Sequence, residues 1–235
     1  MNALEILNLI RIKDWVKNII IFLPLIFSGF LLNFDYYSSL IIGFVIFSLI
    51  STSIYILNDI LDIKSDSYHP TKKFNKPLAS GKISLKFAYS LLLISLLFAI
   101  ILIFFHPIVL NSAIIYLMIN LFYNFGLKKI PYIEIFLISF GYIIRIDVGS
   151  KLINVESSIF IIISIYCLAL FFLLLKRVGE MNHTGDKQNY KSRKVLKYYN
   201  KSTLKFLATI SLIFLLINLL LYIININYKL IFSFV

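Results

Sequence analysis

The sequence predicts an all-α integral membrane protein that forms one transmembrane helical domain over residues 1–235. Hydrophobic residues make up 60% of the chain and the mean hydropathy is +0.91, values outside the range of soluble domains. Several apolar stretches reach the roughly 20 residues that a helix needs to cross the hydrocarbon core of a bilayer. Backbone amides in lipid must find hydrogen-bond partners within their own segment, so these stretches are predicted to be helices.

The predicted spans follow one another along the whole chain. In order, they cover residues 18–34, 38–57, 87–105, 107–123, 131–149, 157–175 and 204–223, and a weaker apolar stub follows at 226–235. Ahead of the first span, residues 3–17 are predicted to form an amphipathic helix, with Trp15 as a membrane-interface anchor. We therefore expect about seven spans plus a C-terminal stub.

The basic residues predict how the chain is oriented. Twenty of the 23 Lys and Arg residues fall in the N-terminal flank and in alternate connections, all on one side of the predicted membrane. The positive-inside rule makes that side cytoplasmic, in a multi-pass protein of the cell membrane. Both long connections, at about 58–86 and 176–203, lie there and are predicted to form the active face. The net charge of +12 thus follows from topology and contact with the lipid bilayer, and no nucleic acid is needed to explain it.

Three of the eleven acidic residues gather just after the second predicted span, in the stretch NDILDIKSD at residues 58–66. Asp59, Asp62 and Asp66 are spaced i, i+3, i+7, which places all three on one face of a continuing helix. Carboxylates this close repel one another, so something cationic must offset the repulsion. The pattern indicates a site for positive charge at the mouth of a hydrophobic bundle.

Two kinds of cation meet this requirement. At an ordinary solvated helix end, the balance would come from nearby basic side chains, namely Lys64, Lys72 and Lys73. The other candidate is a metal ion, because oxygen ligands without His or Cys suit Mg²⁺. Mg²⁺ takes one or two protein carboxylates and completes its shell with water and substrate phosphates, and Asn58 offers an additional amide oxygen. The spacing alone leaves both interpretations open.

The same stretch resembles the first aspartate-rich motif of the UbiA superfamily of intramembrane prenyltransferases. Within it, the chain is most similar to decaprenyl-phosphate phosphoribosyltransferases. Four further segments carry that similarity: RIKDWVKN at 11–18, HPTKKFNKPLASG at 69–81, YNFGLKKIPYIE at 123–134 and LALFFLLLKRVGEM at 168–181. The resemblance covers about residues 8–205, with its segments in the family's order.

The resemblance implies a UbiA-like multi-helix bundle and a Mg²⁺-dependent reaction without an organic cofactor. In that reaction, 5-phosphoribosyl 1-diphosphate would give its phosphoribosyl group to a polyprenyl (decaprenyl-like) phosphate and release diphosphate. Asp59, Asp62 and Asp66 would be the metal ligands and catalytic residues. The implied substrate-binding residues are Asn58, Arg11, Lys17, His69, Lys72, Lys76, Tyr123 and Lys128. A homo-oligomer is one option for the assembly.

The acidic residues of the second long connection distinguish the subfamilies from one another. Prenyl-diphosphate enzymes of the superfamily carry a second D-x-x-x-D motif there, whereas this chain offers only Glu180 and Asp186 among nine cations. That composition favours a phosphate-rich partner over a second metal ion. Two alternatives stay open: a UbiA-type prenyltransferase that acts on an aromatic or lipid acceptor, and a truncated, non-catalytic membrane protein. Truncation is considered because the superfamily fold has nine transmembrane helices.

One charged pair lies within a predicted span. Arg145 and Asp147 fall in the segment 131–149, and Arg145 is about 21 Å from Pro131 at the helical rise of about 1.5 Å per residue. Charges inside spans are functional candidates by default. Because Arg145 lies toward the external end, we expect it to reach the membrane interface or to pair with Asp147.

Overall fold

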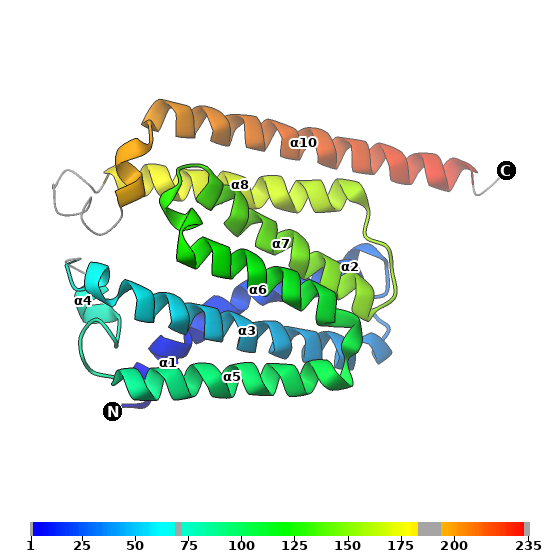
Figure 1. Ribbon diagram of the computed structural model, residues 1–235. Helices are drawn as coiled ribbons and strands as arrows, with labels where there is room; N and C mark the ends of the chain where they lie inside the picture. The colour runs from blue at the N-terminus through cyan, green and yellow to red at the C-terminus, as the bar shows by residue number, and fades with distance from the viewer. Residues whose placement is uncertain (1, 69–71, 183–193, 233–235) are drawn as a thin grey trace.

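The computed structural model describes residues 2–68, 72–182 and 194–232, and it arranges them as a bundle of parallel and antiparallel helices (Figure 1). The helices, in order, are α1 (Ala3–Ile10), η1 (Ile12–Phe22), α2 (Leu23–Phe27), α3 (Asp35–Asp66), α4 (Lys72–Asn75), α5 (Leu85–Phe105), η2 (Pro107–Val109), α6 (Leu110–Phe125), η3 (Leu127–Lys129), α7 (Ile133–Leu152), α8 (Ile159–Asn182), η4 (Lys194–Tyr198) and α10 (Lys201–Phe232). Over these described ranges every regular element is helical, as predicted.

Five helical segments are long and apolar enough to cross a membrane: α3, α5, η2 with α6, α8 and α10 up to Asn225. The 20-residue α7 is also a helix, but it carries four charged residues, namely Glu134, Arg145, Asp147 and Lys151. The predicted count of seven spans is therefore not confirmed, although the all-α membrane class is. The predicted spans over residues 38–57, 87–105 and 204–223 fall within α3, α5 and α10. The span over 107–123 is covered by η2 and α6 together, and the span over 157–175 begins two residues before α8.

The segment before α3 differs from the prediction. The predicted helix over residues 3–17 is broken at Arg11, whose backbone is left-handed (φ 55°). An eleven-residue 3₁₀ helix, η1, follows, and α2 ends at Phe27, so no α-helix spans residues 18–34. Close packing accompanies this irregular path, because a Cβ atom at Gly149 of α7 would collide with the backbone carbonyl of Ile21. Apolar length predicts burial in lipid but does not distinguish a 3₁₀ helix from an α-helix.

Several helices continue past their predicted ends. The 32 residues of α3 extend for about 48 Å at about 1.5 Å per residue, and they include the three aspartates in the last turns. Likewise, α8 continues to Asn182. The predicted stub at 226–235 is not a separate element, because α10 runs unbroken to Phe232. Charged residues lowered the hydropathy at these positions without ending the helices.

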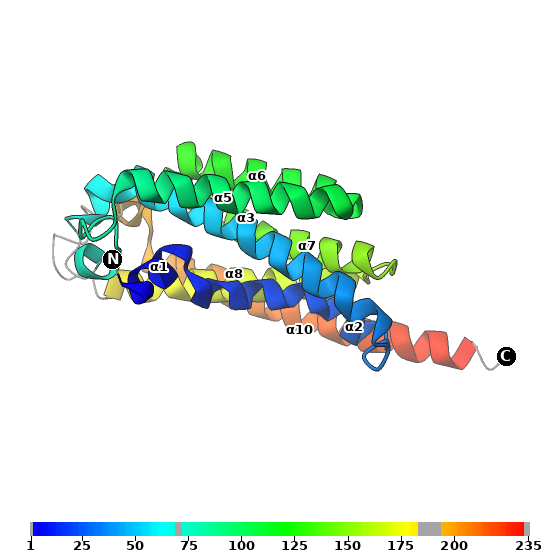
Figure 2. The same ribbon diagram turned by 90° about the horizontal axis from the view of Figure 1, so that it is seen from below.

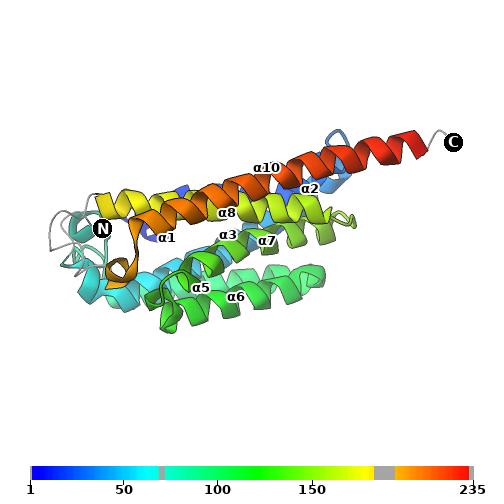
Figure 3. The same ribbon diagram turned by 90° about the horizontal axis from the view of Figure 1, so that it is seen from above.

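Figure 1 shows that the ends of α3, α6 and α8 lie at the same end of the bundle as the beginnings of α5, α7 and α10. We call this the basic end, since it also holds α4, η3 and η4 with their lysines. Figures 2 and 3 show α5 beside α3, and α10 along the outer side of α8. The outward faces of α5 and α10 expose large apolar side chains, as expected for surfaces in contact with lipid.

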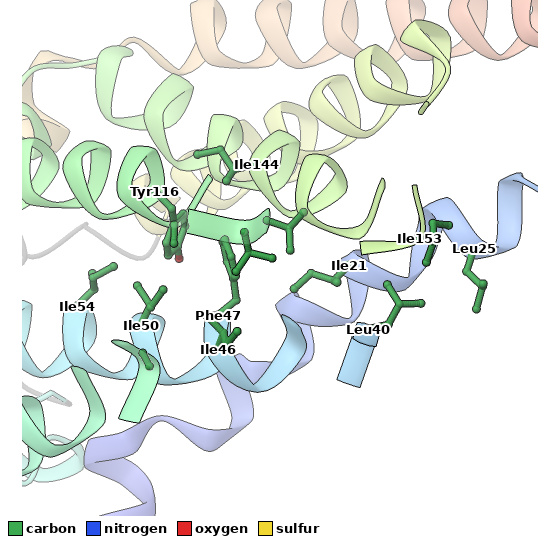
Figure 4. Close-up of a cluster of buried hydrophobic side chains, with 14 residues drawn as sticks. Ile21, Leu25, Leu40, Ile46, Phe47, Ile50, Ile54, Tyr116, Ile144 and Ile153 are labelled. Carbon is green, nitrogen blue, oxygen red and sulfur yellow. The ribbon is translucent and has the colours of Figure 1, made fainter. Parts of the chain in front are cut away.

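The main core joins α3 to η1, α6 and α7. Figure 4 shows Phe47 and Ile50 of α3 near Ile21 of η1, Ile144 of α7 and Tyr116 of α6, and all five are buried. In lipid, helix association depends on close packing and interhelical hydrogen bonds more than on release of water. This packing holds the last turns of α3 opposite the beginnings of η1 and α7 and the end of α6, where the candidate site lies.

Candidate active site

A cavity of about 1940 Å³ begins at the basic end and extends inward between η1, α3, α6, α7 and α8. Its outer part is lined by Asp59, Asp62 and Asp66 of α3, which we call the aspartate face. Its inner part is lined by Tyr116 and Arg145. Among the described residues that line it, ten are basic and five are acidic, so the cavity carries an excess of positive charge.

Each carboxylate of the aspartate face is paired with a cation of the chain. Lys76 Nζ lies between two of them, 2.7 Å from Asp59 Oδ1 and 2.6 Å from Asp66 Oδ2. Arg11 Nη2 donates a second charged hydrogen bond to Asp59 Oδ1 at 2.5 Å. Lys128 Nζ donates to Asp62 Oδ1 at 2.7 Å and to Asn58 Oδ1 at 3.1 Å. The repulsion inferred from the spacing is therefore offset by residues from three separate segments.

The described partners include cations from outside the set expected for a solvated helix end. The side chain of Lys64 is exposed, and Lys73 lies over the ring of Phe74, 6.0 Å from its centroid. Among the side chains that the structure describes, Arg11, Lys76 and Lys128 contact the aspartate face, and all three come from segments that resemble the family's motifs. Their roles as phosphate ligands stay a prediction, but the structure brings them to the site.

The donor set fits a hard divalent cation. Within the described part of the chain, no three acidic, His or Cys groups come together closely enough to enclose an ion by themselves. Mg²⁺ needs only one or two protein carboxylates when phosphates and water supply the rest. Asp59 and Asp66 already share one cation, the Lys76 ammonium, so the structure shows a position where two oxygen ligands stabilise positive charge. Ligation by all three aspartates stays a prediction.

Of the four remaining predicted site residues, two line the cavity. Lys17 lines the cavity, donates to Asp14 Oδ1 at 2.6 Å and lies over the ring of Tyr55, and Tyr123 lines the cavity as well. Lys72 begins α4. The predicted substrate-binding residue His69 lies outside the described residues, and so does Asp186 of the second long connection.

Arg145 contradicts its prediction. It is only 4% exposed, its Nε donates to Asn18 Oδ1 at 2.7 Å, and its other nitrogens donate to the Gly141 carbonyl and the Tyr116 hydroxyl. Asp147 pairs instead with Lys151 at 2.7 Å. Position along the helix did not reveal that Arg145 faces inward, where oxygen acceptors from other helices satisfy the guanidinium. The available signal was the rarity of charge within a span.

A second buried charged cluster, missed by the sequence interpretation, lies at the cavity rim. Arg177, 2% exposed, binds the fully buried Glu134 through Nε and Nη2 at 2.7 and 3.1 Å, and it binds both carboxylate oxygens of Glu180. The Tyr199 hydroxyl donates to Glu134 and accepts from the Tyr132 amide. Burial raises the pKa of Tyr199, and the Glu134 carboxylate raises it further. These hydrogen bonds and ion pairs connect α7, α8 and the segment after η4, and they pair Glu180 with the Arg177 guanidinium.

Fold and site together define an integral membrane protein whose helical bundle encloses a charged cavity that begins at one end. Sequence comparison makes the class specific: residues 21–235 match the UbiA prenyltransferase family, and the chain belongs to that family of membrane transferases. A decaprenyl-phosphate phosphoribosyltransferase of Mycobacterium tuberculosis is 31% identical over 214 residues, which cover 88% of this chain and 69% of that protein. The Mycolicibacterium smegmatis protein of the same name is 32% identical, with 88% and 66% covered.

Solved structures support the fold. A UbiA homolog from Archaeoglobus fulgidus bound to GPP and Mg²⁺ superposes with a TM-score of 0.72 at 18% sequence identity, covering 98% of this chain and 86% of that one. At this identity the likeness establishes the shared fold and not the substrate. The predicted UbiA-like bundle is thereby confirmed.

Proposed function

We propose that the protein transfers the phosphoribosyl group of 5-phosphoribosyl 1-diphosphate to a polyprenyl phosphate in a Mg²⁺-dependent reaction. The observation that carries this proposal is the charge of the cavity. Three of its five acidic residues form the aspartate face of α3, and the other two are engaged by cations, Glu180 by Arg177 and Asp14 by Lys17. One metal-diphosphate site surrounded by excess cations matches two anionic substrates, a sugar diphosphate and a lipid phosphate. The names of the mycobacterial relatives support the same choice.

In this mechanism the aspartate face, with Asn58, would hold Mg²⁺ against the diphosphate. The bound ion would supply Lewis-acid stabilisation of the charge that develops on the leaving diphosphate. Arg11, Lys76 and Lys128 would turn from the carboxylates to the substrate phosphates, which offer the same charge-assisted hydrogen bonds. An oxygen of the lipid phosphate would then form a bond to C1 of the ribose as the bond between C1 and the diphosphate breaks. The products are polyprenyl-phosphoryl phosphoribose and diphosphate.

The basic end would face the cytoplasm of the cell membrane. This orientation gives the soluble phosphoribosyl diphosphate direct access to the aspartate face, and it agrees with the positive-inside rule. The polyprenyl chain would lie along the apolar walls between helices, with its phosphate at the level of the lysines.

Isotope-labelled phosphoribosyl diphosphate tests the proposal directly. The purified protein, given polyprenyl phosphate and Mg²⁺, should move the label into the lipid fraction, and chelation of Mg²⁺ should abolish the transfer. Transfer from labelled geranyl diphosphate to an aromatic acceptor, with none from phosphoribosyl diphosphate, would instead establish the prenyltransferase alternative. Failure of both reactions would favour a non-catalytic protein.

A further inference from the structure

One face of α6 carries a line of polar side chains into the cavity. Tyr116, Asn120 and Asn124 are spaced i, i+4, i+8, and each lines the cavity. Lys128 follows just beyond the end of the helix and contacts the aspartate face through Asp62. The line therefore runs from the inner part of the cavity to the place where the diphosphate is proposed to bind.

Asn124 differs from its neighbours on this face. The Tyr116 hydroxyl is hydrogen-bonded to Ser51 and Arg145, and the Asn120 amide donates to the Tyr116 carbonyl. Asn124 is only 5% exposed, yet neither its amide nitrogen nor its amide oxygen has a hydrogen-bond partner within the described chain. A buried amide with both groups unpaired is destabilising, and such groups are rare in folded proteins. Its position in the cavity wall points to a ligand that supplies the missing partners.

We propose that Asn124 is a specificity-determining residue that hydrogen-bonds the ribose hydroxyls of the phosphoribosyl donor. This inference rests on the proposed function and identifies a residue that selects the donor. Asn124 lies in the last turn of α6, which ends at Phe125, and Lys128 follows in η3, so the amide lies on the cavity wall next to the contact between Lys128 and Asp62. A diphosphate held at the aspartate face would thus direct its attached group toward Asn124.

The hydrogen-bonding groups of the Asn124 amide are suited to a sugar and not to an isoprenoid. A ribose hydroxyl both donates and accepts, so a pair of hydroxyls satisfies the amide oxygen and the amide nitrogen of one Asn side chain. An isoprenoid chain offers neither group and would leave the amide unpaired in a desolvated site. Sites built to bind a hydroxyl discriminate strongly against ligands that lack it, for this reason. Asn124 would therefore favour the phosphoribosyl donor over a prenyl diphosphate.

Replacing Asn124 by leucine tests the inference, because leucine has a similar size and no polar group. Binding of phosphoribosyl diphosphate to the purified full chain, with Mg²⁺, should weaken roughly 10- to 30-fold, as expected for the loss of two hydrogen bonds to neutral hydroxyls. Inorganic diphosphate should bind within about twofold of the wild type, because it does not reach this residue. Removal of the unpaired amide should leave the melting temperature unchanged or higher.

Ser164→Ala is the matched control. Ser164 is the other described residue with a buried, unpaired polar atom, but it lies on α8 outside the cavity lining. This variant should bind every probe like the wild type. Unchanged affinity of Asn124→Leu for phosphoribosyl diphosphate would overturn the assignment of Asn124 while leaving the proposed function intact. If the wild type instead binds geranyl diphosphate and not phosphoribosyl diphosphate, the proposed function and this inference both fail.

Discussion

Replacing Lys76 by methionine distinguishes two interpretations of the aspartate face: a metal site, and a helix end whose carboxylates only form ion pairs with the chain. The Lys76 ammonium is shared by Asp59 and Asp66, whose side chains are 2% and 3% exposed. Methionine keeps an apolar stem of similar length but removes the charge. Breaking a buried ion pair costs about 3–5 kcal/mol when a charge is left uncompensated. Arg11 remains on Asp59, and the Lys76 side chain is partly exposed, so we expect a loss near the lower value, about 3 kcal/mol.

Mg²⁺ should recover most of this loss if the aspartate face binds the ion. A ligand at 100 times its Kd stabilises the folded state by about 2.7 kcal/mol, which is close to the cost of the substitution. In the wild type, Mg²⁺ must displace Lys76 from both carboxylates, so the same concentration should stabilise it less. Thermal unfolding of the purified proteins measures the difference, with roughly 2–4 °C expected per kcal/mol for a chain of this size.

Lys82→Met is the control, because Lys82 is exposed, follows in the same connection and does not line the cavity. This substitution should leave the melting curve the same as that of the wild type, both with and without Mg²⁺. A NaCl series at matched ionic strength separates metal binding from general screening. If Lys76→Met is destabilised but gains nothing specific from Mg²⁺, the carboxylates serve only the chain's own cations, and the metal site is refuted.

Three further predictions concern other parts of the molecule. Asp62→Asn should lower the rate of phosphoribosyl transfer by at least about 100-fold while the protein stays folded, because each 1.36 kcal/mol of lost transition-state stabilisation lowers the rate tenfold. Activity within a few-fold of the wild type would mean that the carboxylate is not part of a catalytic metal site. Arg145→Leu should destabilise the protein by about 1–3 kcal/mol, because the side chains of Asn18 and Tyr116 lose a buried partner, and equal unfolding curves would contradict a structural role for this network. Reporter fusions after residues 76 and 190 should report a cytoplasmic location, and fusions near residues 35 and 154 an external one. The reverse pattern would place the aspartate face on the side of the membrane away from its soluble substrate.

The membrane class and the position of the site follow from local features of the chain. Runs of about 20 apolar residues predict spans because a bilayer requires that length. The i, i+3, i+7 spacing of Asp59, Asp62 and Asp66 predicts a shared face because helical geometry repeats regardless of context. Both features were readable from the sequence, and the structure shows the three aspartates in the last turns of α3.

The partners of those aspartates were not readable in the same way. Arg11, Lys76 and Lys128 had been expected to bind phosphate, whereas nearby lysines were considered as the balancing charges. Arg11 reaches Asp59 across 48 positions in the chain, and Lys128 reaches Asp62 across 66. Only the tertiary structure, which places Arg11 after α1 and Lys128 in η3 beside the last turns of α3, brings these groups within hydrogen-bond distance.

Arg145 shows the same division most clearly. Its sequence position indicated a charge within a span, and it could not distinguish an inward-facing residue from one that reaches the interface. The answer depends on Asn18, 127 positions away, whose amide oxygen lies 2.7 Å from the guanidinium. Helix length and spacing are set by neighbours in the chain and by the bilayer, so they can be predicted locally. Hydrogen-bond partners within the bundle are set by distances through space, which only the assembled helices determine.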